Sequence, residues 1–220
     1  MTEKEQADCP YFLHSSIQLY AMVKQLHLTQ KCTADAIGPM YCGNMQMICT
    51  NDPFICTYLS PLDAVMGSRT LARDDDHFWP IDFRQVDTRR FMEQHGRLLL
   101  AVNYAYAATA GHLAVSDAGH PLMTYTFASF DVPVEHRAHF TIRFPDRVVK
   151  QIETAYLRAG LSGFSKTLDM MNTWTASQIA EAEAEAFAHM PPTIDVEGAV
   201  IDQYAIYDPE SADWVFTNFD

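Results

Sequence analysis

Three side chains that could read the edges of DNA bases alternate with apolar residues between positions 139 and 144. They are His139, Thr141 and Arg143, and an extended backbone would place all three on one face of a strand. Arginine is the usual partner of guanine O6 and N7, and threonine can contact either type of base pair. The pattern predicts a strand with a base-reading face and a buried face. The buried face would carry the apolar side chains Phe140, Ile142 and Phe144.

Basic residues gather around this strand, although the chain as a whole is acidic. Residues 136–175 carry six basic and three acidic side chains, residues 1–135 carry nine and 15, and residues 176–220 carry none and ten. The formal net charge of the chain is −13, which by itself opposes binding to a polyanion. Because the local sign of charge decides which surface meets DNA, residues 136–175 are the candidate nucleic-acid-binding segment.

The residues after the strand predict two short helices. Pro145 suits the first turn of a helix, and apolar residues then recur at helical spacing until Gly160, a residue type that commonly ends helices. Ser162 can cap a second helix. The buried face of that helix would carry Phe164, Leu168 and Met171. The predicted order is therefore strand, helix, tight turn, helix.

A single strand has no pairing partner within this segment, so its backbone hydrogen bonds must be made elsewhere. Pairing with the same strand of a second copy is the simplest solution, and an antiparallel two-stranded ribbon fits the major groove of DNA. Phe140, Ile142 and Phe144 would then form the core under this ribbon. The sequence therefore predicts a homodimer that binds double-stranded DNA.

The run from His139 to Trp174 resembles the ribbon-helix-helix family, which includes the Arc and MetJ repressors, in its order of strand, proline, helix, glycine turn and serine-capped helix. It covers about a sixth of the chain. The resemblance implies that the base-contacting residues are His139, Thr141 and Arg143. It also implies that backbone N–H groups hold a phosphate at Ser162, Gly163 and Phe164, in keeping with the affinity of helix N-termini for anions. Further candidates for phosphate contacts are Arg137, Arg147, Lys150 and Lys166.

The order of elements in the whole chain is also similar to that of the AcaB type of activator encoded by conjugative plasmids. This resemblance implies a transcriptional activator of conjugative-transfer genes that contacts RNA polymerase or another regulator, and the acidic surface outside the DNA-binding segment points the same way. The alternative is a protein-interaction module, antitoxin-like or chaperone-like, that binds no DNA. It would use the helices predicted over 88–110 and 176–188.

The first 135 residues predict mainly helices. Apolar residues approximate helical spacing over 11–28 and over 88–110. A third apolar stretch, 40–62, is interrupted near Pro53 and predicts two helices. Residues 122–127 predict a strand. This region would supply dimer and partner contacts.

The C-terminal residues complete the predicted architecture. The Ala- and Glu-rich stretch 176–188 predicts a helix, and the acidic stretch 193–220 has too many aromatic residues for a disordered tail, so it should pack on the rest of the chain. The predicted fold class is α+β, mostly α-helical. It has three regions, which are a helical region at 1–135, the ribbon-helix-helix unit at 136–175, and a C-terminal extension at 176–220.

The composition also predicts where the protein acts. No apolar stretch approaches the roughly 20 residues that cross a bilayer, and residues 1–10 lack the basic and then apolar order of a signal peptide. We therefore expect a cytoplasmic protein with no membrane partner. The five cysteines all fall between Cys9 and Cys56, a pattern that favours reduced thiols over a disulfide framework.

Two groups of residues could bind a metal ion. The cysteines together with His14 and His27 offer zinc ligands, but they lack the Cys-x-x-Cys pair that structural zinc sites commonly use. The run from Arg73 to His77 contains three aspartates that could hold a divalent cation, although a solvated acidic loop fits it better. We expect no metal site and no cofactor.

Two other groups could form a catalytic or ligand-binding site. His112 and His120 flank Ser116 in a glycine-containing loop, but no strand-to-helix elbow surrounds that serine. The Met and Cys residues between 40 and 56 could line a ligand pocket, although core packing explains them as well. The sequence therefore predicts no enzyme activity.

Overall fold

The structure, a computed structural model, describes residues 12–15, 17–25, 45–47, 54–69, 78–86, 88, 91–92, 95–132, 139–197 and 199–219. These residues form a mixed β-sheet with helices packed against it. The structure is 32% helical and 36% strand, so strands form the larger share. The prediction of a mostly α-helical protein is therefore wrong.

Strand β6 (Leu98–Thr109) forms the centre of the sheet. Its residues from Leu100 to Ala108 are all buried. A strand covered on both faces reads as an unbroken apolar run, without the alternation that marks a half-exposed strand. This run satisfied the helical spacing equally well. The helix predicted over 88–110 is therefore wrong.

Among the described residues, four strands pair with β6. Strands β7 (His112–Val115) and β8 (Met123–Phe130) run antiparallel to it. Strand β4 (Ile55–Tyr58) is parallel to β6, and β11 (Gln203–Asp208) is antiparallel. Strand β8 confirms the strand predicted at 122–127, with a later end.

Five further strands extend the sheet to ten strands. Strand β2 (Tyr20–Gln25) is antiparallel to β3 (Met45–Met47), to β4 and to β5 (Phe78–Asp82). Strand β10 (Thr193–Asp195) is parallel to β7, and β12 (Asp213–Asn218) is antiparallel to β11. Strands thus occupy parts of 11–28 and 40–62, where helices were predicted. A short strand that is buried in a sheet shows no alternation of apolar and polar residues. Its sequence therefore cannot be distinguished from that of a buried helix by periodicity.

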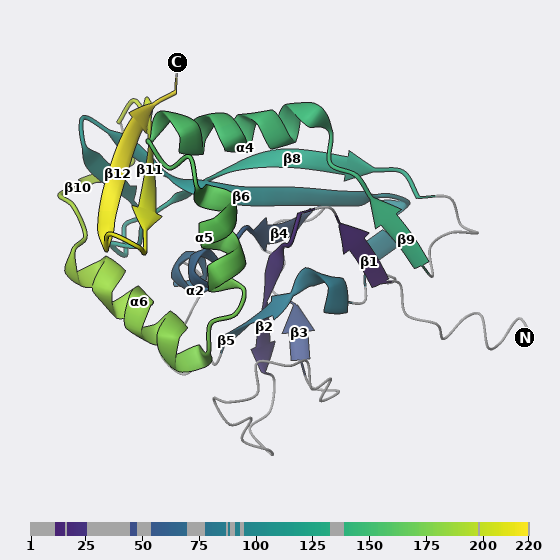
Figure 1. Cartoon of the computed structure of the whole chain (residues 1–220). Coiled ribbons are helices and arrows are strands. Elements are labelled where there is room, and N and C mark those ends of the chain that lie inside the picture. The colour runs from purple at the N-terminus through teal and green to yellow at the C-terminus, as the bar shows by residue number, and fades with distance from the viewer. Residues whose placement is uncertain are drawn as a thin grey trace, which may run out of the picture.

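The described helices pack against this sheet. They are α2 (Pro61–Ser68), α4 (Asp146–Arg158), α5 (Phe164–Met171) and α6 (Ala176–Ala188), with a single 3-10 turn, η1 (Phe83–Gln85). Figure 1 shows α4 lying along β8 and β6 at the top of the view, with α5 below it and α6 at the lower left. Helix α6 has the bounds that the sequence predicted.

One hydrophobic cluster joins α4 to the sheet. The buried face of α4 includes Val148, Ile152 and Tyr156, and it shares this cluster with Leu100 and Tyr104 of β6. The predicted unit at 136–175 therefore shares its core with strands from the region predicted at 1–135.

The acidic C-terminal residues pack as predicted. Trp214 of β12 is buried, and its indole N–H donates a hydrogen bond to the carbonyl oxygen of Ala186 on α6 over 3.1 Å. Its ring lies edge-on to the ring of Tyr106, with centroids 5.1 Å apart. Aromatic rings in this geometry stabilise a core beyond the area that they bury.

Candidate nucleic-acid interface

The predicted ribbon strand exists, but it has a partner in its own chain. Strand β9 (His139–Ile142) pairs in parallel with β1 (Phe12–Ser15), with Phe12 opposite His139 and Ser15 opposite Ile142. The premise that the strand lacks a partner within one chain is therefore wrong, because its partner lies far away in the sequence. The other edge of β9 has no strand partner within the described part of the chain.

The apolar face of β9 packs inside the same chain. Ile142 and Phe144 are 4% and 2% exposed and belong to the main core cluster. The Phe144 ring lies perpendicular to that of Phe130 on β8, with centroids 5.4 Å apart. The sequence placed these two side chains under an intersubunit ribbon, but the structure places them in the core of one chain. The side chains of His139 and Phe140 lie outside the described residues.

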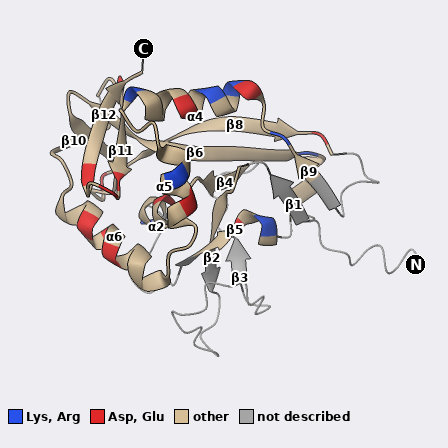
Figure 2. Cartoon of the chain, viewed as in Figure 1, with Lys and Arg blue, Asp and Glu red and all other residues tan. Residues whose placement is uncertain are grey.

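Three exposed cations follow one another from the end of β9 onto the first turns of α4. They are Arg143, Arg147 and Lys150, which we call the cation row, and Thr141 is exposed on the strand just before them. Arg147 and Lys150 are three positions apart and so share the solvent face of α4. Figure 2 shows both blue and red segments on α4, and red segments along α6. The sequence prediction that these residues are accessible to a polyanion agrees with their exposure.

The ion pair that Arg143 of the cation row forms within the chain is weak. Arg143 Nη2 lies 3.9 Å from Asp146 Oδ1, with the two side chains 87% and 80% exposed. Exposed pairs of this kind contribute little and are screened by salt. The guanidinium of Arg143 can therefore exchange this contact for a phosphate or a base at low cost.

The expected phosphate site at the start of the second helix is only partly formed. Gly160 ends α4 with a φ of 78°, as predicted. Helix α5, however, has Gly163 as its N-cap residue with no side-chain cap, so the prediction that Ser162 caps it is wrong. The N–H of Phe164 already donates to the carbonyl oxygen of Leu161 over 3.1 Å.

Other predicted phosphate contacts have mixed outcomes. Ser162, Gly163 and Lys166 are exposed, whereas Phe164 is half-buried, with its ring 4.6 Å from the ring of Tyr156. Arg137 lies outside the described residues. The structure brings the cation row together, but it does not give the α5 N-terminus three available N–H groups.

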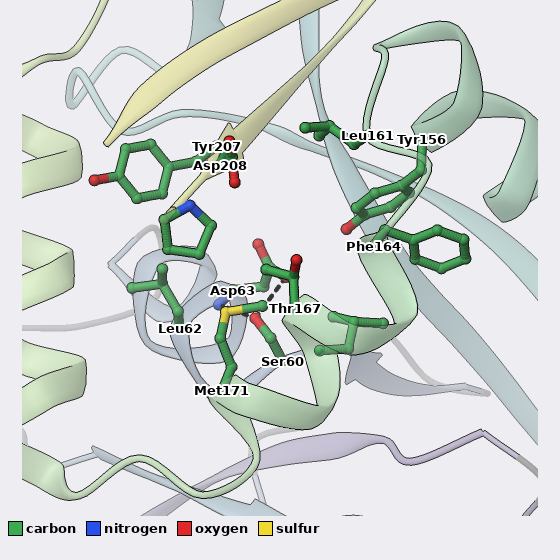
Figure 3. A pocket seen from close by; sticks show the side chains of 12 residues that line it. Ser60, Leu62, Asp63, Tyr156, Leu161, Phe164, Thr167, Met171, Tyr207 and Asp208 are labelled. Carbon is green, nitrogen blue, oxygen red and sulfur yellow. Dashed lines mark hydrogen bonds between the residues drawn. The ribbon is translucent and has the colours of Figure 1, made fainter. Parts of the chain in front are cut away.

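Sequence reasoning missed a buried polar cluster beneath α5 (Figure 3). Ser60 caps α2, its hydroxyl donating to Asp63 Oδ2 over 2.7 Å and accepting from the Asp63 N–H over 3.0 Å. The hydroxyl of Tyr106 donates to Asp63 Oδ1 over 3.2 Å. Burial raises the pKa of the Asp63 carboxyl, although both hydrogen bonds oppose that shift. The Ser-Pro-Leu-Asp spacing is a capping-box signature that could have predicted this pair.

The cavity beside this cluster is small. It has a volume of about 20 Å³ and is lined by Asp63, Tyr156 and Thr167, among others. That volume suits a single water molecule. The Ser60 hydroxyl and the Asp63 carboxylate are engaged in the N-cap of α2 and with Tyr106 of β6. We therefore interpret the cluster as structural: it fixes the start of α2 against the sheet.

The loop between His112 and His120 forms a turn without the geometry of a catalytic site. Gly119 donates its N–H to the carbonyl oxygen of Ser116 over 2.7 Å, and Nδ1 of His112 lies 2.9 Å from the carbonyl oxygen of Ala110. The Ser116 hydroxyl is buried with no hydrogen-bond partner in the part of the chain that the structure describes, so neither histidine is placed to take its proton.

The metal and thiol predictions are only partly covered by the structure. Among the described residues no group of three or more His, Cys, Asp or Glu side chains could hold a metal ion. The acidic run at 73–77 and four of the five cysteines lie outside those residues. Cys56, on β4, is half-buried.

No family model matches the chain, and neither a curated protein nor a solved structure is detectably similar to it. No helix in the described part of the chain is both long and apolar enough to cross a membrane. The candidate site must therefore be judged on its own geometry.

Proposed function

We propose that this chain is a DNA-binding transcriptional regulator that contacts the duplex with Thr141 and the cation row. The observation that supports this proposal is the exposure of Arg143, Arg147 and Lys150 on one short segment of an otherwise acidic chain, with Asp146 the one carboxylate in sequence between them. Phosphate neutralisation by such side chains supplies most of the non-specific affinity for DNA.

The proposed mode of binding uses two copies of the chain. The edge of β9 that β1 leaves open would pair with the same edge of a second copy, and Thr141 and Arg143 of both copies would point into the major groove. Arg147 and Lys150 would contact the flanking phosphates. This ribbon differs from that of the ribbon-helix-helix family, because each β9 strand keeps β1 as its intrachain neighbour.

The regulator would act in the cytoplasm, as the sequence predicts. Its acidic α6 and C-terminal strands lie away from the cation row and would be free to contact RNA polymerase or another regulator. Activation of conjugative-transfer genes is the role that we propose on the basis of the AcaB resemblance.

Electrophoretic mobility shifts on fragments from the gene's own neighbourhood test this proposal. We expect Arg143→Ala to weaken specific binding by about 1–3 kcal/mol. Arg147→Ala and Lys150→Ala should weaken binding to all DNA sequences. Each should also reduce the slope of log affinity against log salt concentration by about 1, the value for one phosphate contact.

The matched control is Arg158→Ala, which removes the same charge from the other end of α4, about 16 Å from Arg147 along the helix axis. It should change affinity far less than the variants of the cation row. If the wild-type protein shifts no DNA at low salt, or if Arg158→Ala weakens binding as much as Arg147→Ala does, the proposal is wrong.

A protein-interaction module is the second candidate, and an exposed aromatic cluster favours it. Tyr125 and Phe127 on β8 are 49% and 42% exposed, and their ring centroids lie 5.1 Å apart. The Phe54 ring stacks on the Tyr125 ring and meets the Phe127 ring edge-on. Exposed aromatic residues are enriched at protein interfaces. A well-folded protein that binds no DNA, and whose partner is lost in Tyr125→Ser with Phe127→Ser, would favour this function.

A further inference from the structure

A cavity between α4 and α5 has the size of a small-molecule site. Its volume is about 210 Å³, and its wall includes Leu59, Ile152, Phe164 and Leu168. Of these residues Leu59 and Ile152 are buried. An apolar cavity of about 150 Å³ already accommodates benzene, so this one has room for an aromatic ring with a short substituent.

Contacts at both ends of α5 fix this helix beside the cavity. At the C-terminal end, the Asn172 amide donates to Gln18 Oε1 over 3.1 Å, and the Tyr20 hydroxyl donates to Asn172 Oδ1 over 2.8 Å. Gln18 in turn donates to the Tyr20 hydroxyl over 2.9 Å, which closes the network. At the N-terminal end, the Phe164 ring packs on Tyr156. The site is therefore pre-formed, which lowers the cost of binding.

The charges at the cavity are of one sign. Both charged residues among the described ones that line it are carboxylates, Glu153 on α4 and Asp169 on α5. Both are exposed, and neither forms an ion pair with another described residue. Lys150 and Lys166 lie one helical turn before them but are not ion-paired with them. Two unpaired carboxylates on facing helices favour a cation at the mouth of the cavity.

We propose that this cavity binds a small organic amine with an apolar body of about the size of a phenyl ring. The apolar body would fill the space between Leu59, Ile152 and Phe164. The ammonium group would lie between Glu153 and Asp169 and donate charge-assisted hydrogen bonds to them. This site adjoins the cation row at Lys150 but shares no residue with it, and the proposal does not depend on DNA binding.

Calorimetric titration of the full chain with 2-phenylethylamine at pH 7 tests the proposal. We expect saturable binding of one molecule per chain. Phenylacetate, which has a similar body and the opposite charge, and ethylamine, which has the charge without the body, should each bind at least about tenfold more weakly.

Variants separate this site from a non-specific surface effect. Glu153→Gln with Asp169→Asn should weaken 2-phenylethylamine binding at least about tenfold, because the charge-assisted hydrogen bonds are lost. Glu181→Gln on α6, a matched loss of an exposed carboxylate, should leave it unchanged. Ser165→Phe, at an exposed position that lines the cavity, should block binding and serves as a second variant should the first not fold.

Three results would overturn the proposal. They are the absence of saturable binding to the wild-type protein, equal affinity for phenylacetate, and unchanged affinity in a folded Glu153→Gln, Asp169→Asn protein or in Ser165→Phe.

Discussion

Neighbouring residues of the β9–α4 segment have opposite environments. From Thr141 to Phe144 the side chains are exposed, buried, exposed and buried in turn, which is the alternation that the sequence predicted. The alternation tells which residues share a face, because it follows from the pleat of a strand. It does not show whether the buried face packs on a second copy or on the chain itself. In this structure it packs in the chain's own core.

Replacing Ile142 by aspartate tests that placement. Ile142→Asp puts an unpaired charge into the core, so we expect the free energy of unfolding to fall by at least about 3 kcal/mol. Thr141→Asp, the matched change on the exposed face, should alter it by no more than about 0.5 kcal/mol. Urea unfolding at two protein concentrations is the measurement. A loss that depends on protein concentration would instead place Ile142 at an interface between copies.

Asp63 predicts a pH dependence of stability with a definite sign. Because its pKa is raised in the folded protein, the folded state binds this proton more tightly than the unfolded state does. The contribution is full below the ordinary pKa of 3.8 and is lost as pH rises through the raised value. Across that window stability should fall by at most about 1.4 kcal/mol per pH unit.

Asp63→Asn should remove this dependence, because the amide does not titrate. Urea unfolding of both proteins between pH 4 and pH 8 measures it, with Asp169→Asn, an exposed carboxylate, as the control. Parallel pH profiles for the wild type and Asp63→Asn would contradict the assignment.

At the scale of elements, the sequence predicted best those structures whose signals are local. Helix α4 has a proline before it and a glycine after it, and α6 is rich in Ala and Glu and is followed by two prolines, so neighbouring residues alone define their ends. Strand β6 was missed because it is buried on both faces and so shows an unbroken apolar run without the alternation of a half-exposed strand. The pairing of β1 with β9, which changes the candidate site, has no local signal either.

The turn between α4 and α5 offers a test of such a local signal. Gly160 and Gly163 both have open space where a Cβ would lie, but only Gly160 has a positive φ. Gly160→Ala should therefore destabilise the protein by about 1–2 kcal/mol, the cost of left-handed backbone for a residue with a side chain. Gly163→Ala should destabilise the protein by no more than half of that amount. Thermal unfolding of both variants measures this difference. Equal losses of stability would contradict the conformational argument.

At the scale of the whole molecule, folding and the proposed DNA binding should respond to salt in opposite directions. A net charge of −13 makes the folded chain repel itself, and salt screens that repulsion. Raising the salt concentration from 20 to 200 mM, as an order-of-magnitude range, should raise the unfolding temperature while it weakens DNA binding steeply. Unfolding temperature and DNA affinity measured on the same samples check this. If both rise or both fall, one of the two electrostatic arguments is wrong.

The pairing of β1 with β9 also constrains how the chain is made. During translation β1 leaves the ribosome long before β9 exists, and at roughly 5–20 residues per second the delay lasts on the order of 6–25 s. Throughout that time β1 has no strand to pair with, and contacts so distant in sequence slow folding. We therefore expect newly made chains to be most vulnerable to proteases and most dependent on chaperones until β9 has emerged, and the finished protein to refold slowly from denaturant.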